Sequence, residues 1–133
     1  MKILLVDDSK TMRSVQKRTL MQMGEIEFIE AGDGIEALHV IATSGGFDLG
    51  LIDWNMPNMD GRTLICKIRE TDKKTPLIMC TTEAEKPRIL EALKAGVNNY
   101  IVKPFASEVL LEKVQATLKK AAEAAAAAPA AAA

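Results

Sequence analysis

The sequence has few of the residues that cross-link small folds or bind soft metals, with two cysteines and a single histidine among 133 residues. Cys66 and Cys80 form no Cys-x-x-Cys pair, which argues against a disulfide framework or a zinc site and predicts two buried thiols. No apolar run is long enough for a signal peptide or a membrane span. A net charge of -1 gives no basic excess for a nucleic-acid surface. These absences predict a one-domain cytoplasmic protein with neither a nucleic-acid nor a membrane partner.

What the sequence does contain is five short apolar runs that alternate with five segments of helical periodicity. The runs at 3–6, 49–52 and 76–81 are almost continuously apolar, which is typical of strands buried on both faces of a parallel sheet. The runs at 26–31 and 99–102 have the character of edge strands. We therefore predict an α/β fold with a doubly wound, flavodoxin-like sheet of five parallel strands in the order 2-1-3-4-5, and five helices on its two faces.

The end of the chain differs in composition from the rest. Residues 121–133 are nearly all alanine, interrupted by Glu123 and Pro129, and carry no large side chain that could bury a face. We expect one domain over residues 1–120, followed by a low-complexity tail at 121–133 that is partly helical up to Pro129 or disordered.

Polar residues stand where four of the predicted strands end. The first strand ends in two aspartates, the third in an aspartate, the fourth in a threonine and the fifth in a lysine: Asp7, Asp8, Asp53, Thr81 and Lys103. Each alone could be a helix cap or a turn residue. Because the carboxyl ends of parallel strands meet at one edge of a sheet, all five are expected to gather there.

This set of side chains indicates phosphoryl chemistry. Three carboxylates held close together repel one another, and a hard divalent cation resolves that repulsion. Oxygen ligands on one side of a cleft suit Mg²⁺. Lys103 and the Thr81 hydroxyl then match the oxygens of a phosphoryl group. Asp53, in the middle, is the expected nucleophile.

Four motifs carry a resemblance to a known family. They are Val-Asp-Asp-Ser at 6–9, Asp-Trp-Asn-Met-Pro-Asn-Met-Asp-Gly at 53–61, Cys-Thr-Thr-Glu-Ala at 80–84 and Tyr-Ile-Val-Lys-Pro-Phe at 100–105. In this order and spacing the sequence resembles the response-regulator receiver domains of two-component signalling, especially the stand-alone chemotaxis (CheY-like) type. The resemblance covers about residues 2 to 119.

The resemblance implies a role for each site residue. Asp53 would accept a phosphoryl group from a sensor histidine kinase, with Mg²⁺ as the cofactor. The implied metal ligands are Asp7 (mainly through water), Asp8, Asp53 and the backbone carbonyl of Asn55. Lys103 and Thr81 would contact the phosphoryl group. Thr81 and Tyr100 would form the switch, and Asn55 and Glu83 would tune the rate of hydrolysis. The Lys103-Pro104 peptide would be cis.

The predicted function is a phosphorylation-activated switch that catalyses only its own phosphorylation and dephosphorylation and is not a multiple-turnover enzyme. We expect a monomer when unphosphorylated, with output by direct contact with a flagellar motor switch protein or a phosphatase in chemotaxis. The main alternative is a non-chemotaxis single-domain receiver that relays phosphate or regulates a kinase. Three other interpretations are a phosphate-ester hydrolase, a flavin or nucleotide binder, and an interaction module without phosphorylation; the non-glycine-rich Asp-Asp-Ser-Lys loop argues against the second of these.

Overall fold

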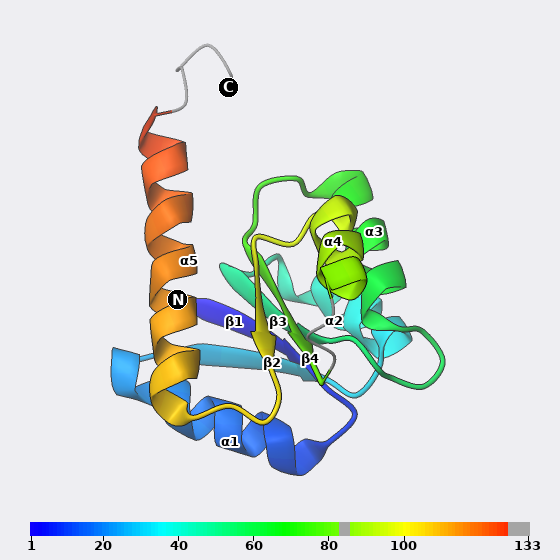
Figure 1. Cartoon of the computed structure of the whole chain (residues 1–133), viewed down its shortest axis with the longest axis horizontal. Coiled ribbons are helices and arrows are strands. Elements are labelled where there is room, and N and C mark those ends of the chain that lie inside the picture. Colours follow the sequence, from blue (N-terminus) through cyan, green and yellow to red (C-terminus); the bar gives the residue numbers. More distant parts are fainter. Residues whose placement is uncertain (83–85, 128–133) are drawn as a thin grey trace.

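Strands and helices alternate along the described residues, 1–82 and 86–127, of the computed structural model (Figure 1). The strands are β1 (Lys2–Val6), β2 (Glu27–Ala31), β3 (Leu49–Asp53), β4 (Leu77–Thr81) and β5 (Asn99–Val102). The helices are α1 (Lys10–Leu20), α2 (Gly34–Ser44), α3 (Gly61–Thr71), α4 (Lys86–Ala95) and α5 (Ser107–Ala127), and a 3-10 turn (Met21–Met23) follows α1.

The five strands form one parallel sheet in the order β2-β1-β3-β4-β5, which confirms the predicted fold class. The three inner strands are continuous apolar runs because both of their faces are covered. In the register, Val6 pairs with Ile52 and Asp53 pairs with Cys80. The carboxyl ends of β1, β3 and β4 are therefore level with one another at one edge of the sheet.

Two apolar layers hold the helices on the sheet. Helices α2, α3 and α4 cover one face, and α1 and α5 cover the other (Figure 1). Leu64, Ile65 and Ile68 of α3 pack inward, which leaves Cys66 on the outer face of that helix. The prediction that Cys66 is buried was thus wrong, whereas Cys80 is buried within β4 and desolvation raises the pKa of its thiol to about 12.

Three helices start with a side-chain cap close to the carboxyl edge of the sheet. The side chains of Ser9, Asp33 and Asp60 accept hydrogen bonds from the backbone N–H of the third residue of α1, α2 and α3, at 3.1, 2.8 and 2.7 Å. Helix α5 is the longest, and its last turns, formed by the alanine-rich residues up to Ala127, pass beyond the rest of the fold (Figure 1). None of the helices described is long and apolar enough to span a membrane.

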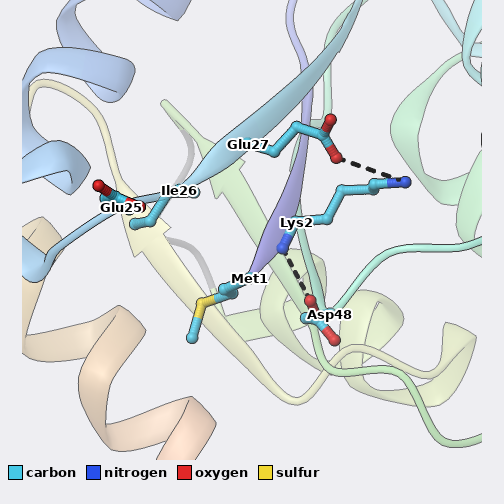
Figure 2. Close-up of a pocket in the computed structure, with 6 residues that line it drawn as sticks. All are labelled: Met1, Lys2, Glu25, Ile26, Glu27 and Asp48. Carbon is cyan, nitrogen blue, oxygen red and sulfur yellow. Dashed lines mark hydrogen bonds and ion pairs between the residues drawn. The ribbon is translucent and has the colours of Figure 1, made fainter.

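At the opposite edge, where the strands begin, a hollow lies beside the start of β1 (Figure 2). The backbone N–H of Lys2 donates to Asp48 at 2.7 Å, and its ammonium group donates to the Ser44 carbonyl at 3.0 Å. The same ammonium group lies 3.5 Å from the Glu27 carboxylate. The cation in this hollow is therefore paired within the chain, and these contacts fix the first strand.

Candidate functional site

Three carboxylates meet at the carboxyl edge of the sheet. Asp7 and Asp8 follow β1, Asp53 is the last residue of β3, and one oxygen from each lies within 4.8 Å of the other two. Asp7 and Asp53 are buried, with exposed fractions of 1% and 7%, whereas Asp8 is exposed. The cluster is therefore held by the protein on one side and open to water on the other.

Lys103, just after β5, supplies the positive charge of this cluster. Its ammonium nitrogen lies 2.7 Å from Asp7 Oδ2 and 3.3 Å from Asp53 Oδ1. Burial acts to lower the pKa of Lys103, but the hydrogen bond to Asp7 and the charges of Asp53 and Asp7 outweigh it and raise this pKa above its ordinary value. The lysine is thus held charged between two buried carboxylates.

The pKa of Asp53 is shifted in the direction that disfavours its ionised form. Burial raises this pKa, and although the Lys103 charge acts to lower it, the charges of Asp7 and Asp8 add to the burial effect and keep it above the ordinary range. A divalent cation beside Asp53 would reduce this penalty, because its charge would favour the ionised carboxylate and offset the repulsion among the three carboxylates.

The loop after β3 is pressed against the backbone that carries Asp53. The N–H of Gly61 donates to the Trp54 carbonyl at 2.9 Å, and a Cβ at Gly61 would lie only 2.3 Å from the Asp53 carbonyl oxygen. In the same loop, Asn58 has a φ of 66° and its amide donates to the Asp33 carboxylate at 2.9 Å. These contacts fix where β3 ends, and only glycine fits at position 61.

A second set of contacts positions Asp7 from the side of α1. The backbone N–H of Ser9 donates to Asp7 Oδ1 at 2.8 Å, and the Arg13 guanidinium donates to the Asp7 carbonyl oxygen. Arg13 and Lys17 both bind the Glu30 carboxylate of β2, at 3.1 and 2.9 Å.

Sequence reasoning missed Ser9, Arg13 and Gly61 as residues that hold the site in place. The spacing from Asp7 to Arg13 was the available signal for Arg13, because it places a cation on the first turn of α1.

Of the remaining predicted site residues, Thr81, Tyr100 and Asn55 belong to the described part of the chain. Thr81 is buried at the end of β4, and its carbonyl accepts from the Lys103 backbone N–H at 2.7 Å. Tyr100, in β5, is half-buried, with the Lys113 ammonium 4.8 Å from its ring centroid. Asn55 is exposed in the loop after Asp53, and Glu83 lies outside the described residues. The peptide bond between Lys103 and Pro104 is cis, as predicted.

The acidic cluster fits a hard divalent cation. Its donors are carboxylate oxygens close enough to share one ion, and the exposed side at Asp8 leaves room for water ligands, which Mg²⁺ retains. A softer metal would need histidine or thiolate ligands, and the only histidine, His39, is exposed on α2.

An open parallel sheet with carboxylates and a lysine gathered at its carboxyl edge defines an α/β protein of the doubly wound class, in which ligands bind at that edge. The model of the response regulator receiver domain matches residues 3–115. The chain therefore belongs to the response regulator receiver family, as the motifs predicted.

Named relatives resemble nearly the whole chain. It is 47% identical over 120 residues to "Chemotaxis protein CheY1" of Helicobacter pylori, covering 89% of this chain and 97% of the relative. It is 46% identical over 117 residues to "Chemotaxis protein CheY" of Pseudomonas aeruginosa, covering 86% and 94%. Among solved structures, chemotaxis response regulator CheY4 of Vibrio cholerae matches with a TM-score of 0.80 and 37% identity, covering 87% of this chain and 97% of that one.

Proposed function

We propose that this protein is a signalling switch whose Asp53 accepts a phosphoryl group from a phosphohistidine of a sensor kinase. The observation that supports this most is the contact of a lysine with two of three clustered carboxylates at a strand end. Like charges are costly to keep together, so their arrangement needs a ligand that uses them. A phosphoryl group and a divalent cation together use both the carboxylates and the lysine.

In the proposed step, a carboxylate oxygen of Asp53 attacks phosphorus, the P–N bond breaks, and its electron pair stays on the imidazole nitrogen, which takes a proton from water. Asp7, Asp8, Asp53 and the Asn55 carbonyl would hold Mg²⁺, which supplies positive charge to the oxygens of the transferring group. Lys103 would release part of its contact with Asp53 and pair with a phosphoryl oxygen, and the Thr81 hydroxyl would donate to another.

The proposed output is a local rearrangement rather than a new catalytic activity. We infer that Thr81 and Tyr100 form the switch, since both lie on adjacent strands β4 and β5 that lead from the site to α4 and α5. Asn55 and Glu83 would set how fast water removes the phosphoryl group. The protein would thus catalyse only its own phosphorylation and dephosphorylation, and residues 1–120 would form the receiver domain.

The proposed pathway is chemotaxis, because the relatives named above carry that word in their names and are covered over most of their length. A flagellar motor switch protein or a phosphatase would then be the partner. The alternative is a receiver that relays phosphate or regulates a kinase outside chemotaxis. A cytoplasmic location and a monomeric unphosphorylated state remain predictions from the sequence.

Intact-protein mass spectrometry tests the phosphoacceptor. After incubation with acetyl phosphate, the unmodified chain is expected to gain one phosphoryl group that base and hydroxylamine remove, and only when Mg²⁺ is present, whereas Asp53→Asn is expected to gain none. Asp60→Asn is the matched control, because Asn caps α3 as well as Asp does and the residue lies in the same loop. Stoichiometric phosphorylation of Asp53→Asn would overturn the proposal.

A further inference from the structure

A cleft of about 1080 Å³ lies at the edge of the sheet opposite the acidic cluster, between the end of α5 and the loop that joins α3 to β4. Figure 1 shows that loop, in green, beside the distal turns of α5, in orange and red. Four lysines and one glutamate line the cleft with two asparagines and several small residues: Lys73, Lys74, Lys119, Lys120, Glu123, Asn98, Asn99, Ala116, Thr117, Ala121, Ala124 and Ala125.

The lysines of this cleft belong to two elements that hydrogen bonds hold in place. Lys73 and Lys74 belong to a turn closed by Asp72, whose carboxylate accepts from the backbone N–H groups of Lys74 and Thr75, both at 3.0 Å. Lys119 and Lys120 are on α5, which is anchored two and three residues earlier, where the Asn99 amide donates to the Thr117 hydroxyl at 3.1 Å. The positive charges therefore face the cleft from both walls.

These four ammonium groups have no ion-pair or hydrogen-bond partner in the described part of the chain. The hollow in Figure 2 is the contrast, because there Lys2 is bound by Glu27 and by Ser44. A protein with a net charge of -1 thus carries a cleft with a local excess of positive charge, four lysines against the single carboxylate of Glu123. Such a local field attracts an oppositely charged partner.

One wall of the cleft is also apolar and lies beyond the part of the chain that matches the family. Ala121, Ala124 and Ala125 line it on α5, whereas the family match ends at residue 115. Alanines allow a second helix to approach closely. The cleft thus offers charge on one side and a small apolar surface on the other, and it is separate from the proposed phosphorylation site.

We propose that this cleft, named here the lysine cleft, is a docking site for an acidic amphipathic helix of a partner protein. Glutamates or aspartates on one face of that helix would pair with Lys73, Lys74 and Lys120, and its apolar face would pack on the alanines of α5. A nucleic acid is a poorer match, because the residues that line the cleft include neither an aromatic ring for base stacking nor an arginine.

An NMR titration of the full chain tests the proposal. The probe is a synthetic peptide of about 15 residues with glutamate on one helical face and alanine and leucine on the other, near the length at which an isolated helix becomes stable. We expect saturable shifts confined to amides at 73–74, 98–99 and 116–125. Charge reversal in K73E/K74E or K119E/K120E is expected to weaken binding at least about tenfold.

The matched control is R18E/K94E, which makes the same change of charge at exposed positions outside the lysine cleft and should alter the affinity less than about twofold. Shifts spread over the whole surface, or equal weakening in the control, would refute a defined site. Tighter binding of a single-stranded oligonucleotide at the same amides would refute the proposed occupant. Phosphorylation of Asp53 is measured separately, so a failure of either proposal leaves the other intact.

Discussion

The two edges of the sheet handle charge in opposite ways. At the carboxyl edge, the Lys103 ammonium touches two carboxylates and all three side chains are largely buried. At the other edge, four exposed lysines line the lysine cleft, and their ammonium groups have no ion-pair partner among the described residues. The first arrangement is pre-organised for a small, highly charged ligand, because its groups are desolvated and held by the backbone. The second is solvated and suits a larger partner that brings its own charge.

This difference predicts where substitutions affect stability. Buried groups that depend on one another are costly to change singly, because the remaining partner is left desolvated and unpaired. Exposed lysines are already solvated, so their replacement leaves little behind. Removing the buried cation of the acidic edge should therefore cost stability, whereas removing a lysine of the lysine cleft should weaken binding only.

The largest effect is expected from Gly61→Ala at the acidic edge. The new Cβ would stand 2.3 Å from the Asp53 carbonyl oxygen, and the backbone of β3 cannot move aside without shifting the site. We expect a loss of about 3 kcal/mol or more in the free energy of unfolding, measured by urea denaturation.

Gly32→Ala is the matched control for this substitution, because a Cβ there meets only side-chain atoms at 3.6 and 3.9 Å. Its cost should stay below about 1 kcal/mol. Similar losses for the two glycines would show that the close approach at Gly61 is not the reason for its presence.

A smaller effect is expected from Lys103→Met, which keeps much of the side-chain volume but removes the charge between Asp7 and Asp53. The loss should be about 2–3 kcal/mol without metal, since two buried carboxylates are left without their cation. Added Mg²⁺ should stabilise this variant more than the unmodified chain, because the ion replaces the missing positive charge. Thermal unfolding with and without Mg²⁺ measures both.

Lys74→Met makes the same change in the lysine cleft. It should alter the stability by no more than about 0.5 kcal/mol and should not change the response to Mg²⁺. A comparable loss in Lys74→Met would remove the proposed distinction between the two edges.

The sequence predicted the acidic edge well, for a physical reason. Apolar runs that end in polar residues mark both a strand and its end, so Asp7, Asp53 and Lys103 could be placed at one edge before any coordinates were known. The strand order is also that of the family, so the prediction of this order depended on the resemblance as much as on the periodicity.

The lysine cleft and the supports of the site could not be predicted in the same way. Lys73, Lys74, Lys119 and Lys120 form two ordinary Lys-Lys pairs that are far apart in the sequence, and only the path of α5 brings them to one cleft. The exposure of Cys66 was missed because helical periodicity among neighbouring apolar residues does not fix the edge of the buried face. The closeness of Gly61 to the Asp53 backbone depends on the path of the loop, which local pattern does not give.

The smallest effects on stability are expected from replacing Asp53, at the acidic edge, and Asp72, beside the lysine cleft. Burial raises the pKa of Asp53, with the Asp7 and Asp8 charges adding to it, so its ionised form is unfavourable and Asp53→Asn should stabilise the metal-free protein near neutral pH by more than about 0.5 kcal/mol. Burial acts to raise the pKa of Asp72 as well, but hydrogen bonds from Thr75 and Lys74 lower it. Asp72→Asn should therefore cost about 1 kcal/mol.

The pH dependence gives the sign of each effect independently. A carboxyl with a lowered folded-state pKa contributes stability above its unfolded pKa of about 3.9 and loses it as the pH falls through the folded-state value, so the cost of Asp72→Asn should shrink in acid. A carboxyl with a raised pKa behaves in the opposite way: Asp53 becomes protonated first in the folded protein, and the advantage of Asp53→Asn should disappear as the pH falls toward that unfolded value. Urea denaturation at a series of pH values with a chelator present measures both. If the change in unfolding free energy followed the pH in the same way for both variants, the pKa values of Asp53 and Asp72 would be shifted in the same direction, and the proposed difference between the two edges would be wrong.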